Sequence, residues 1–214
     1  DLMLEHNYVM KKYGYDERNL SDIKKLAGRG SKVMLTRSMH EIAELSGKIK
    51  KTDDVVEKMT KEFIDFYSKN IAEESSLKNG VLDFLSWCKK NSISMGVCTN
   101  KQEHLSIDLL KKIKICHFFD YVAGGNTFNH NKPNPKHLTE QIEILVGTIN
   151  KNLMVGNSTT DSNASKTSII SGHNSLADSL RSLEHCCRKA GRLVGLVGNK
   201  EIDFVPLNGP RKPS

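Results

Sequence analysis

Polar side chains that could bind a phosphate group stand near the ends of short apolar runs in the sequence. Thr99 and Asn100 directly follow one apolar run, and Asn157 and Asp161 follow another. Lys132 lies between them, in a loop that two prolines stiffen. Hydroxyl and ammonium groups donate hydrogen bonds to phosphate, while amide and carboxylate oxygens are ligands for Mg²⁺. Each feature alone is more typical of a turn or a solvated loop, but together they predict a site for phosphate and Mg²⁺.

Short strands alternating with helices would bring these side chains together. The apolar runs predict strands at residues 93–98, 119–123 and 153–155, and helices at residues 81–90 and 105–113. A further helix is expected around residues 142–146. Alternation of this kind is typical of βαβ units in a parallel sheet. Ligands bind such sheets at the carboxyl ends of the strands, so the candidate residues would meet at one edge.

The part of the chain before this pattern is predicted to be a small all-helical domain, residues 1–76. Apolar residues recur at helical spacing over residues 53–67, and nothing in this part alternates with a period of two. Shorter helices are expected at about residues 23–27 and 32–45, after an opening helix that Gly14 ends. The α/β core would then occupy residues 77–170.

Residues 171–214 have a different character and are expected to form an atypical, partly disordered tail. A helix at 180–190 and a strand within 191–198 are predicted, although glycines weaken the strand. The last six residues, Gly-Pro-Arg-Lys-Pro-Ser, are expected to be disordered.

Composition favours a soluble globular protein in the cytoplasm. Hydrophobic residues make up 37% and charged residues 27% of the chain, and no apolar run reaches the length of about 20 residues that a membrane span needs. The net charge of +7 is spread over lysines beside acidic residues, and only 6% of residues are aromatic, which argues against nucleic acid as a partner. Five cysteines without C-x-x-C spacing suit a reducing compartment. We therefore expect no membrane partner, and a monomer or homodimer.

The order and spacing of the motifs resemble the haloacid dehalogenase superfamily. Thr99 is similar to the second motif of that family and Lys132 to the third. Residues 156–161 are similar to the fourth, usually written Gly-Asp-Ser-x-x-Asp. Residues 118–125 and 132–138 resemble the phosphoglycolate phosphatase branch, as do parts of the helical segment, which is similar to that branch's cap. The resemblance covers about residues 1–166.

This resemblance implies a fold and an activity. The fold would be α/β, a Rossmann-like parallel-sheet core with a small all-helical cap. The activity would be Mg²⁺-dependent hydrolysis of a small phosphorylated acid such as 2-phosphoglycolate, through an aspartyl-phosphate. Thr99 would bind the phosphoryl oxygens and Lys132 would neutralise charge, while Asn100 and Arg29 would bind substrate. Arg29 suits a substrate carboxylate because a guanidinium can bind one through two hydrogen bonds, although a solvated loop arginine is the alternative.

Two departures from the family pattern concern the chemistry. The nucleophile motif Asp-x-Asp-Gly-Thr does not occur in these 214 residues, and we expect it, with the central first strand of the sheet, to stand upstream of Asp1. Asn157 stands where the family usually has a Mg²⁺-binding Asp, which leaves Asp161 as the carboxylate of the predicted metal pair. Whether the chain is an enzyme by itself is therefore open, and little or no turnover is expected.

A third departure is the tail. The sequence after about residue 167 does not resemble the family, which leads to the hypothesis of a frameshifted, inserted or split gene product. Two other interpretations of the whole chain stay open. One is a non-catalytic remnant or phosphate-binding pseudoenzyme, and the other is a phosphosugar mutase of the same superfamily, which shares every motif found.

Overall fold

The computed structural model of the chain describes residues 2–26, 30–46, 53–72, 75, 77, 80–145, 152–156, 159–167, 171–174 and 192–194. The predicted tail helix at residues 180–190 lies outside these ranges. The chain divides into two compact units, Asp1–Ser75 and Ser76–Ser214.

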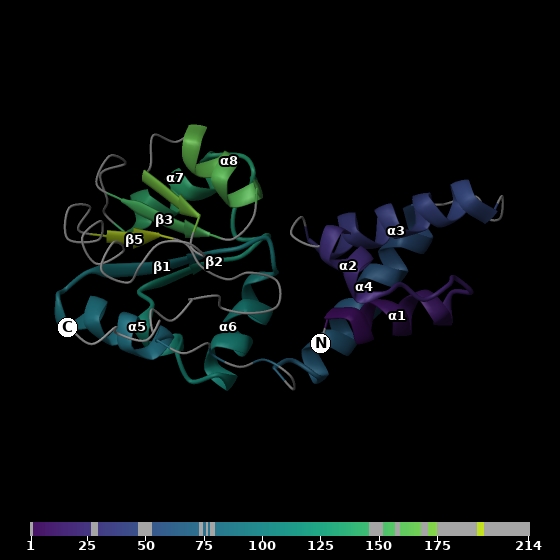
Figure 1. Ribbon diagram of the computed structural model, residues 1–214, viewed down its shortest axis with the longest axis horizontal. Helices are drawn as coiled ribbons and strands as arrows, with labels where there is room; N and C mark the ends of the chain where they lie inside the picture. The colour runs from purple at the N-terminus through teal and green to yellow at the C-terminus, as the bar shows by residue number, and fades with distance from the viewer. Residues whose placement is uncertain are drawn as a thin grey trace, which may run out of the picture. The chain divides into compact units, whose positions relative to one another are not determined.

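The first unit is a bundle of four described helices, α1 (Leu2–Lys12), α2 (Leu20–Leu26), α3 (Ser31–Ser46) and α4 (Asp53–Lys69). Helix α4 packs against both α1 and α3, and α2 packs against α3 (Figure 1). Val9, Met10, Ile23 and Met59 are fully buried between them. Helix α2 begins three residues before the predicted start because the Asn19 side chain caps it, accepting the Asp22 N–H at 3.0 Å.

The second unit is an α/β domain with helices on both faces of a parallel sheet. Its elements are α5 (Val81–Lys90), β1 (Ser94–Cys98), α6 (Glu103–Lys112), a 3₁₀ turn (Cys116–Phe118), β2 (Tyr121–Ala123), α7 (Lys136–Ile144), β3 (Leu153–Gly156), α8 (Thr159–Thr167), β4 (Ser171–Asn174) and β5 (Arg192–Val194). The strand order is β2-β1-β5-β3-β4, and every described pairing is parallel. Helices α7 and α8 lie on one side of the sheet and α5 and α6 on the other (Figure 1). The predicted α/β class with a parallel sheet and a helical unit is thereby confirmed.

The hydrophobic core of this domain lies between the sheet and helices α7 and α8. Cys98, Leu138, Ile142, Met154 and Ala164 form one buried cluster there. These residues come from two strands and two helices, so packing of this core fixes the strand ends relative to the helix starts. That arrangement positions the polar residues described below. Among the described residues, no helix is long and apolar enough to cross a membrane.

The C-terminal segment is the main difference from the sequence-based expectation. We expected the central strand of the sheet to be missing and residues 171–214 to be unrelated to the core. Instead, β4 pairs with β3, and β5 lies between β1 and β3. Leu193 is in register with Met95 on one side and Leu153 on the other. The two facing strands would otherwise leave buried backbone N–H and C=O groups unpaired, and a short apolar stretch from the tail satisfies them.

Candidate functional site

Thr99 directly follows β1 and is almost fully buried. Its backbone N–H donates to the carbonyl oxygen of Ala123 at 2.9 Å, which ties it to the end of β2. Its hydroxyl oxygen accepts the N–H of Lys101 at 3.1 Å. Because that bond uses an oxygen lone pair, the hydroxyl hydrogen can be donated to an acceptor such as a phosphoryl oxygen.

Lys132 reaches the same strand end from the loop before α7. Its Nζ donates to the carbonyl oxygen of Cys98 at 2.6 Å and to Oδ1 of Asp161 at 2.5 Å. The Cys98 carbonyl belongs to the peptide bond that leads to Thr99, so the ammonium lies beside the predicted second motif. An ammonium has three hydrogens, and these two contacts with described residues leave a third hydrogen for a ligand. The side chain is only 5% exposed, which strengthens its electrostatic interactions.

Asp161 lies in the first turn of α8 and is buried beside the end of β3. No helix was predicted here, and the structure has one that begins at Thr159. Gly156 makes the close approach of strand and helix feasible, because a Cβ at this position would lie 2.4 Å from the Asp161 Cβ. A carboxylate in the first turn also interacts favourably with the helix dipole.

Asn100 contacts the loop that carries Lys132. Its Nδ2 donates to the backbone carbonyl oxygen of Lys132 at 2.8 Å, so this side chain helps to shape the site from within the protein. Its predicted contact with substrate stays a prediction. Arg29 and Asn157, the other two predicted site residues, lie outside the described residues. The structure thus brings together Thr99, Asn100, Lys132 and Asp161.

Two buried neighbours of Lys132 were not singled out from the sequence. Nδ1 of His137 accepts the backbone N–H of Lys132 at 3.2 Å, and Cys98 supplies the carbonyl already described. Burial, and then the positive charge of Lys132, lower the pKa of His137 to about 4, so its ring is neutral near neutral pH. Burial raises the pKa of the Cys98 thiol to about 12, which excludes a thiolate nucleophile there at ordinary pH. The sequence signal for His137 was its place within residues 132–138, which resemble the phosphoglycolate phosphatase branch.

The residues at this edge fit Mg²⁺ in part. Asp161 offers a hard oxygen donor, and Mg²⁺ is often bound by one or two carboxylates together with phosphate oxygens and water. Within the described ranges, however, no group of three or more His, Cys, Asp or Glu side chains could hold a metal ion. Asp161 is thus a candidate ligand, and a complete protein site would need further donors.

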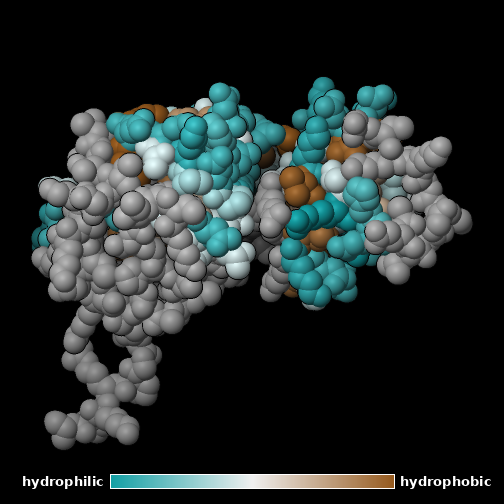
Figure 2. Space-filling view, turned by 90° about the horizontal axis from the view of Figure 1, so that it is seen from above, coloured by the Kyte–Doolittle hydropathy of each residue, from teal (hydrophilic) through white to brown (hydrophobic). Residues whose placement is uncertain are grey.

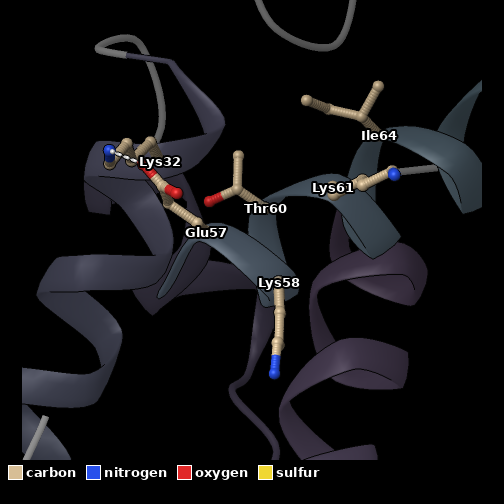
Figure 3. A pocket seen from close by; sticks show the side chains of 6 residues that line it. All are labelled: Lys32, Glu57, Lys58, Thr60, Lys61 and Ile64. Atoms are coloured by element: carbon tan, nitrogen blue, oxygen red, sulfur yellow. Dashed lines mark hydrogen bonds and ion pairs between the residues drawn. The ribbon is translucent and has the colours of Figure 1, made fainter. Parts of the chain in front are cut away.

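The helical unit carries a separate surface hollow of about 510 Å³, which contains none of the predicted site residues. Figure 3 shows its lining, namely Lys32, Glu57, Lys58, Thr60, Lys61 and Ile64. Lys32 pairs with Glu57 at 3.4 Å, so part of the positive charge is neutralised. On the face of the helical unit seen in Figure 2, the described surface is largely hydrophilic, with some hydrophobic side chains exposed.

Comparison with known proteins agrees with this arrangement. The family model described as haloacid dehalogenase-like hydrolase matches residues 2–172. The phosphoglycolate phosphatase of Mesorhizobium japonicum is 33% identical over 143 residues, which cover 67% of this chain and 61% of the relative. That of Agrobacterium fabrum is 28% identical over 170 residues, or 79% of this chain and 71% of the relative.

Solved structures share the fold at lower identity. A predicted phosphoglycolate phosphatase from Haemophilus somnus superposes with a TM-score of 0.74 at 21% identity, covering 95% of this chain and 81% of that one. The β-phosphoglucomutase of Clostridium difficile gives a TM-score of 0.66 at 18% identity, covering 95% and 85%. The chain spans 61% of the length of the M. japonicum relative, whereas the family model covers most of the chain itself. The chain therefore belongs to the haloacid dehalogenase-like hydrolase family.

Proposed function

We propose that this chain supplies the phosphate-binding edge and the cap of a phosphatase that acts on a small phosphorylated acid, with 2-phosphoglycolate as the first candidate substrate. The observation that carries the proposal is the buried Lys132 ammonium, held between the Cys98 carbonyl and Asp161 directly beside Thr99. The similarity to phosphoglycolate phosphatases supports the substrate class.

In this proposal, each residue acts on the phosphoryl group through position and charge. The Thr99 hydroxyl donates to one phosphoryl oxygen, and the remaining N–H of Lys132 donates to another. The ammonium also stabilises negative charge that develops as the phosphoryl group is transferred. Mg²⁺, held by Asp161 and Asn157 with the substrate phosphate, would add further positive charge. Residues 1–76 would act as the cap, with Arg29 binding the substrate carboxylate.

The proposed reaction requires a nucleophile motif that these 214 residues do not contain. Phosphoryl transfer in this scheme needs a carboxylate nucleophile, and no Asp-x-Asp sequence occurs in the chain. We propose that a segment outside this sequence supplies it, and that the chain alone binds phosphate without turnover. A phosphate-binding pseudoenzyme is the competing function.

A hydrolysis assay tests this proposal. The chain is incubated with p-nitrophenyl phosphate or 2-phosphoglycolate and Mg²⁺, and released phosphate or nitrophenol is measured. We expect background rates for the chain alone, and turnover when the upstream coding sequence is expressed with it. Robust turnover by the chain alone that Lys132→Ala abolishes would overturn the dependence on an outside nucleophile. Absence of turnover with the upstream sequence present would favour the pseudoenzyme.

A further inference from the structure

His137 is a buried histidine whose ring contacts the backbone of the key lysine. It lies in the first turn of α7 and is fully buried. Its Nδ1 accepts the backbone N–H of Lys132 at 3.2 Å. Phe128 packs against the ring edge-on, with centroids 5.7 Å apart and planes at 84°. The position of the ring is therefore fixed, and its Nδ1 atom acts as the hydrogen-bond acceptor.

The protonation state of the ring follows from this contact. A nitrogen that accepts an N–H carries no hydrogen, so the neutral ring has its hydrogen on Nε2. Burial, the Lys132 charge and the nearby His130 all disfavour the cation, whereas a backbone contact with Gly124 acts in the opposite direction. The acceptor at Nδ1 is consequently available across the neutral pH range.

The backbone of Lys132 is held on both sides. His137 accepts its N–H, and Asn100 donates to its carbonyl oxygen at 2.8 Å. One clamp comes from a helix on a face of the sheet and the other from the turn after β1. A lysine side chain is long and has many rotamers, so the position of its ammonium depends on a backbone that is held in one place. The hydrogen bonds to the N–H and to the carbonyl oxygen of Lys132 hold its backbone in this way.

We propose that His137 is a positioning residue for Lys132, which acts through the backbone N–H of the lysine and, together with Asn100, fixes the point at which the ammonium meets a phosphoryl oxygen. The inference rests on the proposed function, because it assumes that Lys132 binds phosphate. It assigns a role to a residue that was not among the predicted site residues. The alternative is a histidine that only fills the core. The two roles differ in whether a side chain with an acceptor atom in the place of Nδ1 restores phosphate binding.

Two substitutions separate these roles. His137→Asn keeps an acceptor oxygen near the place of Nδ1, whereas His137→Leu fills much of the space and has no acceptor. The full chain is titrated with inorganic phosphate, and its urea midpoint is measured in parallel. A net hydrogen bond is worth about 1 kcal/mol, so we expect His137→Leu to weaken phosphate binding by roughly five- to tenfold and His137→Asn to bind within about threefold of the unchanged chain. Equal affinity of the unchanged chain and a folded His137→Leu variant would overturn the proposal.

A second readout does not depend on phosphate. The Lys132 ammonium gives a ¹⁵N NMR signal when its hydrogens are held in bonds, and we expect this signal in the unchanged chain and His137→Asn but a broadened signal in His137→Leu. If the unchanged chain binds no phosphate, the proposed function fails, and the ammonium signal still decides the role of His137. If His137→Leu does not fold, the spectrum of the unchanged chain decides: a hydrogen on Nδ1 near neutral pH contradicts the proposal, and a bare Nδ1 with the hydrogen on Nε2 supports it.

Discussion

Substitution of Lys132 by Met should destabilise the protein strongly, because it leaves a buried carboxylate without its ammonium partner. The Lys132 Nζ and Asp161 Oδ1 atoms are 2.5 Å apart, and the two side chains are 5% and 11% exposed. At an effective dielectric constant of about 20, two unit charges at this distance attract by roughly 7 kcal/mol, and much of this is offset by the loss of hydration of both groups. Removing one partner of such a buried pair costs about 3–5 kcal/mol.

The measurement is urea unfolding of the full chain, followed by circular dichroism. We expect Lys132→Met to lower the free energy of unfolding by about 3–5 kcal/mol. The double variant Lys132→Met/Asp161→Leu removes both charges and should recover most of that loss, which gives a large coupling energy in a double-mutant cycle. Lys11→Met serves as the control, because its pair with Glu17 is 3.8 Å apart and largely exposed, so little change is expected.

A change in the free energy of unfolding for Lys132→Met that is no larger than for Lys11→Met would contradict this prediction. Simple additivity of the effects of the Lys132 and Asp161 substitutions would contradict it as well. Either result would mean that solvent screens this pair as it screens a surface pair.

Three further predictions concern pH, close packing and the central strand. The pKa of His137 is about 4 in the folded chain and about 6.5 in a free histidine. The unfolded chain therefore binds more protons between these values, so the free energy of unfolding, measured by urea titration at several pH values, should be highest above pH about 6.5 and fall by about 2–3 kcal/mol towards pH 4. His137→Leu should flatten that slope. Gly156→Ala should cost about 1–3 kcal/mol in thermal unfolding, because its Cβ would lie 2.4 Å from the Asp161 Cβ; no loss would contradict that packing. Leu193→Pro should abolish cooperative unfolding, since proline cannot donate within a central strand, and a cooperative variant would place β5 outside the sheet.

Much of the α/β domain could be predicted from the sequence, because apolar runs and turn residues there agree with each other. The helix expected at residues 81–90 is α5, and the strand expected at 93–98 is β1, one residue shorter. Buried parallel strands are continuous apolar runs, and polar residues end them abruptly. The same pattern predicted that Thr99 and Lys132 lie at one edge of the sheet.

Helix α8 and the central place of β5 in the sheet were missed, because the sequence carries no local signal for either. Helix α8 (Thr159–Thr167) is polar and has no apolar face, yet Ala164 packs into the core cluster. A strand was predicted within residues 191–198, where β5 lies. Its place between β1 and β3 was not predicted, because that place depends on two strand edges that are remote in sequence. Tertiary contacts decide both elements, and intrinsic propensity does not. The role proposed for His137 likewise depends on a contact with Lys132 that only the fold reveals.

The central claim is that the edge formed by Thr99, Lys132 and Asp161 binds a phosphoryl group. The most direct test is calorimetric titration of the chain with 2-phosphoglycolate in the presence of Mg²⁺, compared with the isosteric variant Thr99→Val. A hydrogen bond to a charged group is worth about 1.5–3 kcal/mol. The account therefore predicts saturable binding of one ligand per chain, weakened by about tenfold or more in a folded Thr99→Val variant. No binding to the unchanged chain, or equal binding to both, would contradict it.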